Sequence, residues 1–373
     1  MDITNKAGHA VLHLVADETY SRHSEGAFLR MNDGSIFYAY SRFKGFSQGN
    51  VPKNVAPQDV APCDIVALRS YDEGETWTEP EVLLHAEDFG THNIMSVSAL
   101  RMQNGDAALI FGARHKPDEG HHVLVRSNDE FKTFYKTVIC SLPDRPGEYV
   151  LNNDRVIRLK SGRLVMPRAY HRGGTDWNDR DRLYFDHCGS LCFLLSDDDG
   201  ETWHEAPDVV HPPFSRTISG LQEPGVIELE NGVLWAWART DKMYQYECFS
   251  FDQGEHWTQA QPSRFTSPRS PMQIKRNPAD GSLIAIWNPI PNYNGRKQYE
   301  GFFEGRTPIV YAKSADDGKT WSEPIVIEGE EDCGYCYPSI FFTNDGCMLT
   351  GFCSGTQKEK NCLANTTVRK IAL

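Results

Sequence analysis

Cysteine and histidine are the side chains in this sequence whose types could bind a metal ion or carry redox chemistry. Cys333 and Cys336 have CxxC spacing, but no second cysteine pair accompanies them. The ten cysteines are otherwise scattered, several of them in apolar runs typical of strands. His115, His121 and His122 lie in a segment rich in Lys, Asp and Gly, where we expect solvent exposure. We therefore expect reduced core thiols, and neither a catalytic metal nor another cofactor.

The charge and hydropathy of the chain restrict its partners. Lys and Arg number 38 against 51 Asp and Glu, a formal net charge of −13, and there is no basic run. Nucleic acid and anionic membranes are therefore not expected as partners. A small anionic substrate is compatible, because individual arginines act at contact distance. No run of about 18 apolar residues predicts a membrane span, and residues 1–6 do not resemble a signal peptide, so we expect a cytoplasmic protein.

A repeated octet predicts the elements that must position any functional side chain. Its pattern is Ser-x-Asp-x-Gly-x-Thr-Trp or a close variant, with one degraded copy. The copies occupy residues 70–77, 127–134 (the degraded copy), 196–203, 250–257 and 314–321. Asp can accept hydrogen bonds from nearby backbone amides, Gly supplies a positive φ, and the aromatic ring packs the turn against its sheet. Each octet therefore predicts a tight turn between two strands.

A second series of turns alternates with the octets. Each of these turns ends in a glycine and is followed by an apolar strand. The glycines are Gly34, Gly105, Gly162, Gly232, Gly281 and Gly346. One glycine-turn hairpin followed by one octet hairpin makes a unit of four strands, which is a propeller blade. We expect an all-β chain that forms a six-bladed β-propeller as one domain over residues 1–373. Because there are only five octets, one blade either lacks the octet or is closed from both termini.

The octets and the surrounding strand pattern resemble the Asp-boxes of the sialidase (neuraminidase) superfamily, over nearly the whole chain. The resemblance implies a sialidase-like propeller and an exo-acting glycoside hydrolase that releases a terminal acidic sugar with retention. A small acidic sugar or oligosaccharide would then be the binding partner. Asp-boxes occur in enzymes and in binding proteins alike, so the function has to be argued from a site.

The resemblance also implies the chemistry of that site. Three arginines hold a carboxylate on the anomeric carbon of the substrate. Because this carboxylate would repel a carboxylate nucleophile, a tyrosine activated by a glutamate attacks instead, through an oxocarbenium-like transition state. An aspartate serves as general acid and then as general base.

The residues that match the superfamily pattern fall in the expected order along the chain. Arg22 precedes the first glycine turn, although Arg-His-Ser stands where the superfamily has Arg-Ile-Pro. Segment 222–239 supplies Glu223 as the base and Arg239 as the second arginine, and Arg306, before the last octet, is the third.

Two of the implied roles have two candidates each. Tyr337 is the favoured nucleophile, and Tyr335, two residues earlier on the same strand face, is the alternative and a candidate for substrate binding. Asp59, in the long loop after the first hairpin, is the favoured general acid and base. Asp64, which begins the next strand, is the alternative, although capping a turn is its simpler role.

Three further residues are candidates for substrate binding. Arg42 ends the first hairpin, and Asn153 and Arg155 belong to the sequence Asn-Asn-Asp-Arg at 152–155. The superfamily usually has small residues at 152–155, so this departure could select different hydroxyl groups or a different acid sugar.

Two other functions are compatible with the same fold. A uronic-acid lyase or another glycosidase would use His92, His171 and Asn153. A non-catalytic propeller would bind carbohydrate without turnover. The oligomeric state has no signal in the sequence.

Overall fold

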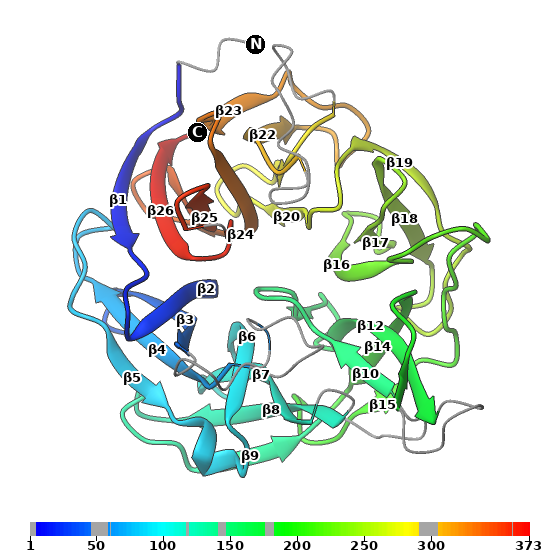
Figure 1. Cartoon of the computed structure of the whole chain (residues 1–373), viewed down its shortest axis with the longest axis horizontal. Helices are drawn as coiled ribbons and strands as arrows, with labels where there is room; N and C mark the ends of the chain where they lie inside the picture. Colours follow the sequence, from blue (N-terminus) through cyan, green and yellow to red (C-terminus); the bar gives the residue numbers. More distant parts are fainter. Residues whose placement is uncertain are drawn as a thin grey trace.

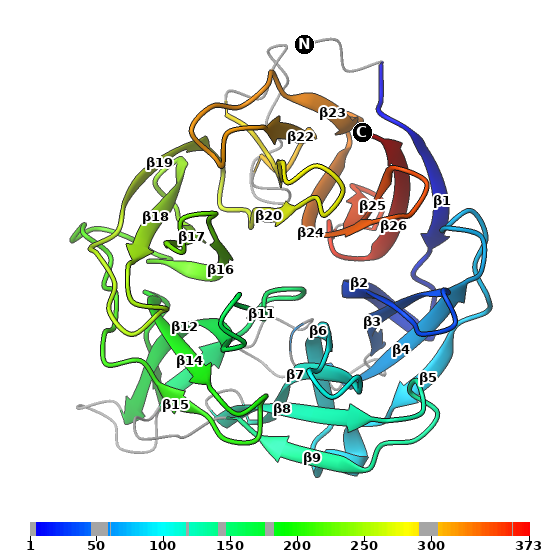
Figure 2. The same cartoon turned by 180° about the vertical axis from the view of Figure 1, so that it is seen from behind.

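The computed structural model describes residues 5–45, 59, 61–116, 119–140, 147–175, 183–290, 305–359 and 361–373. The sheets form a ring around a central axis (Figure 1), which Figure 2 shows from behind, so the chain is a β-propeller. The single helix of these ranges is the short 3₁₀ turn η1 (Ala86–Phe89). A helix with the length and apolarity needed to cross a membrane does not occur among the described residues. The all-β prediction is confirmed.

Hydrogen bonding joins the described strands into five sheets, three of which contain four strands each. The first, in spatial order, is β1 (His9–Leu14), β26 (Asn365–Ala372), β25 (Cys347–Thr356) and β24 (Cys333–Phe342). The second is β16 (Gln222–Glu228), β17 (Leu234–Arg239), β18 (Tyr244–Ser250) and β19 (Gln261–Thr266). The third is β20 (Gln273–Arg276), β21 (Leu283–Trp287), β22 (Ile309–Ser314) and β23 (Ile325–Glu328).

The other two sheets are larger. The six-stranded sheet has the order β10 (Gly147–Val150), β12 (Leu164–Thr175), β14 (Ser190–Ser196) and β15 (His204–Glu205), with β11 (Ile157–Arg158) and β13 (Leu183–Phe185) paired to β12. The eight-stranded sheet has the order β2 (Tyr20–Arg30), β3 (Ile36–Lys44), β4 (Cys63–Ser70), β6 (Asn93–Arg101), β7 (Ala107–Lys116), β8 (Glu119–Ser127) and β9 (Lys136–Ile139), with β5 (Glu81–Leu84) paired to β4.

Hydrogen bonding alone does not divide the described strands into the six blades that the sequence predicts. In the eight-stranded sheet, β2–β5 and β6–β9 are two antiparallel units, and one parallel pair, Cys63 with Asn93, joins β4 to β6. The Asn93 side chain strengthens this junction, since its Nδ2 donates to the Ala61 carbonyl oxygen at 2.7 Å. Sequence periodicity could not reveal this junction, because it depends on contacts between units rather than within one.

Both series of predicted turns are confirmed. The glycine turns close the hairpins β2–β3, β6–β7, β11–β12, β16–β17, β20–β21 and β24–β25. Each octet is held by its own hydrogen bonds, as residues 70–77 illustrate. Asp72 accepts from the Thr76 backbone N–H at 2.9 Å and from its hydroxyl at 2.6 Å, and the Gly74 N–H donates to Ser70 Oγ at 2.8 Å. The Trp77 indole donates to the Gly74 carbonyl oxygen at 3.1 Å.

The ring is closed by strands from both ends of the chain. β1 pairs antiparallel with β26, from His9 opposite Lys370 to Leu14 opposite Thr366. β1 thus takes the outer position that an octet hairpin supplies in the other units (Figure 1). Closure from both termini, one of the two predicted explanations for the missing octet, is therefore confirmed.

Apolar side chains fill the spaces between neighbouring units of the ring. Phe193 stacks on Trp257 with ring centroids 3.8 Å apart, between the six-stranded sheet and β16–β19. Trp237 belongs to the next cluster, between β16–β19 and β20–β23. A further cluster, which includes Phe37 and Phe111, packs β2–β5 against β6–β9. All ten cysteines are free, as predicted, and seven of them are buried.

Candidate active site

Four inner strands carry the same backbone irregularity at the central axis. In each, the strand register shifts by a β-bulge, and one non-glycine residue adopts a left-handed conformation there. These residues are Glu25 in β2 (φ 59°), Ser96 in β6 (φ 61°), Glu223 in β16 (φ 47°) and Tyr337 in β24 (φ 55°). Such conformations cost on the order of 1–3 kcal/mol each and cluster at functional sites. Three of the four side chains can perform acid–base or nucleophilic chemistry.

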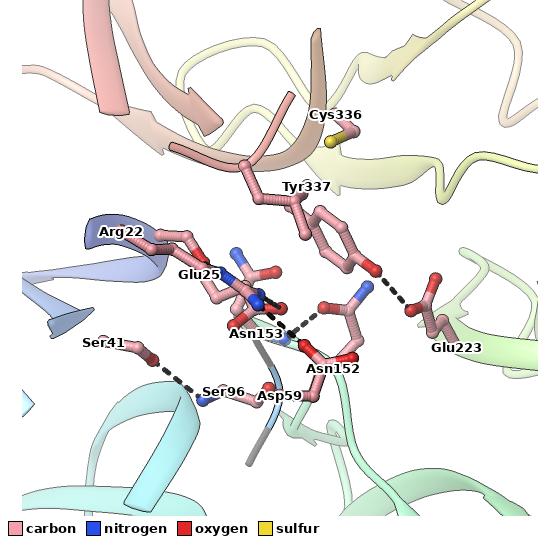
Figure 3. A network of polar contacts seen from close by, with 12 residues as sticks. Arg22, Glu25, Ser41, Asp59, Ser96, Asn152, Asn153, Glu223, Cys336 and Tyr337 are labelled. Atoms are coloured by element: carbon pink, nitrogen blue, oxygen red, sulfur yellow. Dashed lines mark hydrogen bonds and ion pairs between the residues drawn. The ribbon is translucent and has the colours of Figure 1, made fainter. Parts of the chain in front are cut away.

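Tyr337, Glu223 and Arg239 form a hydrogen-bonded cluster across two sheets, and Figure 3 shows the contact between Tyr337 and Glu223. The Tyr337 hydroxyl donates to Glu223 Oε1 at 2.6 Å, and Arg239 Nη1 lies 2.6 Å from Glu223 Oε2. The same Arg239 nitrogen is 3.4 Å from the Tyr337 oxygen, and Nη2 bonds Gln222 at 2.6 Å. Three residues predicted from the sequence thus meet, although 98 and 114 positions separate Arg239 and Glu223 from Tyr337.

The surroundings of Tyr337 determine how it can react. Burial raises the pKa of its hydroxyl well above the ordinary value, and the neighbouring Glu223 carboxylate adds to the increase, while Arg239 and Arg306 oppose it. The free phenolate is therefore a minor species near neutral pH. A base in contact, as Glu223 is, can remove the proton during a reaction without requiring prior ionisation.

Arg306 lies beside Tyr337 and is fixed by backbone and sulfur contacts. Its guanidinium is 5.7 Å from the centroid of the Tyr337 ring. Its Nε and Nη2 donate to the Arg269 carbonyl oxygen at 3.2 and 3.0 Å, and Nη1 faces the sulfur atoms of Cys336 at 3.3 Å and Cys362 at 3.6 Å. These contacts fix the guanidinium beside the Tyr337 ring.

Arg22 and two carboxylates form a second cluster next to the first (Figure 3). Arg22 Nη1 donates to Asp59 at 2.7 Å, Nη2 lies 2.9 Å from Glu25, and Nε donates to Ser24 Oγ at 2.8 Å. Burial alone would lower the pKa of Arg22, but the charges of Glu25 and Asp59 raise it above its ordinary value. Arg22 is thus a permanently charged group with two acidic neighbours.

The two carboxyl groups on Arg22 have opposite pKa shifts. Burial raises the pKa of Glu25 to about 7, although Arg22 acts against the increase. For Asp59 burial also acts upward, but the charges of Arg22 and Arg114 prevail and hold its pKa below the ordinary value. Glu25 is therefore the carboxyl group of this cluster that titrates near neutral pH.

Asp59 and Asp64, the two candidates for the general acid, occupy different environments. The Asp59 backbone carbonyl accepts from Arg114 Nη1 at 2.8 Å, and its side chain is about half exposed. Asp64 is buried, accepts from the Ala86 N–H at 2.9 Å and pairs with Lys44 at 3.0 Å. Asp64 therefore has the structural capping role, and Asp59 belongs to the site. Most of the loop predicted around Asp59 lies outside the described residues.

The segment 152–155 crosses the centre of the ring and contacts four other parts of it. The Asn153 amide donates to the Gly26 carbonyl oxygen at 2.8 Å, and the Asp154 N–H donates to that of Val97 at 2.9 Å. Asp154 Oδ1 pairs with Lys275 at 2.6 Å, and the Ile340 N–H donates to Oδ2 at 3.2 Å. The Arg155 guanidinium bonds the Gln273 side chain. We call residues 152–155 the axial loop.

Other predicted site residues lie away from these clusters. Arg42 stacks on the Tyr20 ring, 4.0 Å from guanidinium carbon to ring centroid. Tyr335 is buried and packs edge-on against Phe352. Tyr337, not Tyr335, therefore reaches Glu223.

The histidines occupy separate environments. His92 is exposed, whereas His171 is buried in β12, with Nδ1 3.1 Å from the Asp186 carbonyl oxygen. The predicted exposure of His122 is wrong, because β8 turns this side chain into the core, where burial holds its pKa well below the ordinary value. The His115 side chain lies outside the described residues. No group of three or more His, Cys, Asp or Glu side chains suited to a metal ion occurs in the described part of the chain.

Glu25 is the site residue that sequence reasoning missed. Its signal was an acidic residue three positions after Arg22 and directly before Gly26 in the first hairpin. The other bulged residues offer a related signal, since Pro follows both Glu223 and Tyr337.

Comparisons with known proteins agree with this architecture. No curated protein matches the chain significantly in sequence. A protein of unknown function from Dyadobacter fermentans is similar in structure, with a TM-score of 0.66 and 17% identity over 97% of this chain and 99% of that one. The NanB sialidase of Streptococcus pneumoniae has a TM-score of 0.68 and 13% identity over 100% and 71%. The Trypanosoma rangeli sialidase, in complex with 2,3-difluorosialic acid as a covalent intermediate, has a TM-score of 0.65 and 16% identity over 94% and 54%.

The family model described as a BNR repeat-like domain matches residues 113–350, which is more than half of the chain. This range contains Glu223, Arg239, Arg306 and Tyr337 and four of the five octets. The chain therefore belongs to the BNR repeat-like domain family, and its fold is that of the sialidase superfamily.

Proposed function

We propose that this protein is an exo-acting, retaining glycoside hydrolase of the sialidase type that removes a terminal acidic sugar. The observation that carries the proposal is the 2.6 Å hydrogen bond from the Tyr337 hydroxyl to Glu223, with Arg239 on the other carboxylate oxygen. A structural tyrosine needs neither a left-handed bulge nor an adjacent base, whereas a nucleophilic one needs the base. A non-catalytic propeller would have no use for this arrangement.

The arginines supply the affinity for an anionic substrate. Arg239 and Arg306 flank Tyr337, with Arg239 Nη1 3.4 Å from its hydroxyl oxygen and the Arg306 guanidinium 5.7 Å from the centroid of its ring. The carboxylate of the sugar would bind these two guanidinium groups and replace Asp59 on Arg22. The sugar carboxylate then offsets the positive charge of Arg22, which holds the pKa of Asp59 below its ordinary value. Asp59 could then hold the proton that it must give to the leaving group.

The reaction proceeds in two displacements with balanced proton transfers. In the first, the Tyr337 oxygen forms a bond to the anomeric carbon as its proton passes to Glu223. The glycosidic bond breaks, and the leaving oxygen takes a proton from Asp59. In the second, water attacks the same carbon, Asp59 accepts a proton from it, and Tyr337 regains its proton from Glu223. Two inversions give net retention.

We also propose that the propeller counts as six blades in one domain over residues 1–373. The units β2–β5 and β6–β9 share only one parallel residue pair and pack against each other through an apolar cluster, as neighbouring blades do. Counting them separately gives one unit for each of the six glycine turns.

The test combines hydrolysis with covalent trapping. We expect the wild-type protein to release a fluorophore from an α-linked acid-sugar glycoside and to gain the mass of one sugar on Tyr337 with 2,3-difluorosialic acid. Tyr337→Phe should lower kcat/KM by about 1,000-fold or more and lose the label, because the nucleophile is gone. The Glu223–Arg239 pair remains in this variant, so the melting temperature should change little.

Tyr335→Phe is the matched control, since it makes the same change two residues away in the core. It should keep both the label and most of the activity. Labelling of another residue would overturn the assignment of the nucleophile. An absence of turnover on every acid-sugar glycoside would overturn the proposed function.

A further inference from the structure

The axial loop is fixed so firmly that its polar groups have defined directions. Its bonds to Gly26, Val97, Lys275 and Ile340 join parts of the ring that are far apart in sequence. A segment held at several points cannot turn a side chain away without breaking these contacts. The side chains of the loop are therefore part of a rigid floor at the axis.

Asn152 is a residue of this loop whose side-chain oxygen accepts a hydrogen bond while its side-chain nitrogen donates none within the described part of the chain. Its Oδ1 accepts from the Asn153 backbone N–H at 2.7 Å, which fixes the orientation of the amide. Its Nδ2 is buried and has no partner among the described residues, and the side chain is 2% exposed. A buried donor without a partner costs about 1–3 kcal/mol, so its retention calls for an explanation.

Two unpartnered acceptors accompany this donor. Asn153 Oδ1 and Glu25 Oε2 are also buried and lack a hydrogen bond within the described ranges. Figure 3 draws Asn152, Asn153 and Glu25 in the space between the Arg22–Asp59 pair and the Tyr337–Glu223 pair. The Asn153 contact with Gly26, next to Glu25, and the Asp154 contact with Ile340, three residues after Tyr337, place the loop beside both clusters.

We propose that Asn152 is a specificity-determining residue that donates a hydrogen bond from Nδ2 to a hydroxyl oxygen of the bound acid sugar. The sugar hydroxyl in turn donates to Asn153 Oδ1 or Glu25 Oε2. A hydroxyl group satisfies both kinds of partner, whereas a hydrogen, a methyl group or an apolar acyl chain leaves the floor unpaired. This inference rests on the proposed function and narrows its substrate class to acid sugars that present a hydroxyl to the axial loop.

The test uses Asn152→Asp with a series of substrates. This variant keeps the oxygen that binds the Asn153 N–H and replaces the Nδ2 donor by a second carboxylate oxygen, which accepts and adds a negative charge. The substrates are a fluorogenic α-linked acid-sugar glycoside and its monodeoxy analogues, each lacking one hydroxyl. We expect one analogue to lose about 10- to 100-fold in kcat/KM on the wild-type protein. On the parent glycoside, Asn152→Asp should have a kcat/KM lower than that of the wild-type protein by a similar factor. On that analogue, the kcat/KM of Asn152→Asp should be little lower than that of the wild-type protein.

Asn231→Asp is the control for the chemical change itself. Asn231 makes a similar local contact in an exposed glycine turn, where its Oδ1 accepts from the N–H of Val233, two residues on, at 3.1 Å. This variant should keep the wild-type ratios across the series. The analogue series on the wild-type protein remains decisive even if Asn152→Asp does not fold.

The two proposals fail in different ways. If the wild-type protein cleaves no acid-sugar glycoside, the proposed function fails and this inference fails with it. If the parent is cleaved but every deoxy analogue reacts equally well, or Asn152→Asp loses the same factor on all substrates, only the role of Asn152 is overturned. Ordered water on the axial loop would then account for the unpartnered groups.

Discussion

Glu25 is held where its ionised form is disfavoured, although a cation is in contact with it. The carboxyl group is buried, and Asp59 and Glu223 add negative charge nearby, so the attraction of Arg22 does not prevail. A folded protein that keeps a proton which the unfolded chain releases becomes less stable as the pH rises. At the scale of the residue, Glu25 therefore keeps a proton in the site near neutral pH, and the free energy of unfolding is lower as a result.

Replacing Glu25 tests this electrostatic cost. The folded-state pKa is about 7, above the ordinary value of 4.5, so stability should fall between about pH 4.5 and pH 7. Glu25→Gln removes this dependence. We expect its free energy of unfolding, relative to wild type, to increase by up to about 3 kcal/mol across that range. Urea unfolding at pH 4.5, 6 and 7.5 measures it.

Glu79→Gln, at an exposed position after the first octet, is the control and should leave the wild-type pH dependence in place. A constant difference between Glu25→Gln and wild type at all three pH values would show that Glu25 ionises normally in the folded protein.

At the scale of the element, the bulge in β16 depends on the glycine that follows it. A Cβ on Gly225 would lie 2.3 Å from the ring of Trp237, which is itself buried and donates to the Met272 carbonyl oxygen at 2.9 Å. The ring cannot withdraw, so the strand would have to move, and Glu223 would move with it. The same relation holds in β2, where a Cβ on Gly26 would lie 2.3 Å from the Tyr38 ring.

Gly225→Ala should therefore reduce stability and activity together. We expect a loss of roughly 3 kcal/mol in the free energy of unfolding from overpacking, and a large loss of kcat/KM because the Glu223–Tyr337 contact is displaced. Gly232→Ala lies in the turn of the same hairpin, where a Cβ meets nothing within 4 Å but φ is +82°. It should cost about 1 kcal/mol and leave kcat/KM unchanged. Equal kinetic effects of the two variants would contradict the argument.

The difference between local and non-local interactions explains which parts of the structure can be predicted from the sequence. The octets are predictable because all their defining hydrogen bonds lie within eight residues. The two bonds that Thr76 donates to Asp72 are an example. Even the degraded copy keeps the bonds to its Ser and Asp, since the Phe131 N–H donates to Ser127 Oγ and the Thr133 N–H to Asp129, both at 2.8 Å, although Phe131 takes the left-handed conformation usually left to glycine.

The arrangement of the site is less predictable from sequence. The Tyr337–Glu223 contact could be anticipated only through the superfamily resemblance, because it joins two sheets. The pairing of Glu25 with Arg22, the bulges and the axial loop depend on how the sheets face one another. No spacing along the chain encodes those contacts.

At the scale of the whole molecule, the ring has a polar axis and an apolar circumference. The apolar clusters lie between neighbouring units, while the centre holds arginines, carboxylates and the axial loop. The groups of the site come from several units, such as Arg22 from β2, Glu223 from β16 and Tyr337 from β24, so the site exists only when the ring is closed. Its geometry is therefore coupled to the pairing of β1 with β26, which joins the two ends of the ring.

Removing β1 tests this coupling between closure and function. Deletion of residues 1–14 would expose the edge of β26 and the apolar side chains around Leu14, which pack with Phe28 and Val368. We expect a melting temperature at least about 10 °C lower, since several kcal/mol of strand pairing and burial are lost. Because Glu25 and Tyr337 lie on the two sheets that β1 helps to hold together, the acid-sugar hydrolase activity should fall even at temperatures where the deleted protein remains folded. Deletion of residues 1–5, which leaves β1 complete, is the control. A shortened protein that lacks β1 but keeps wild-type kcat/KM would show that the site is assembled without closure of the ring.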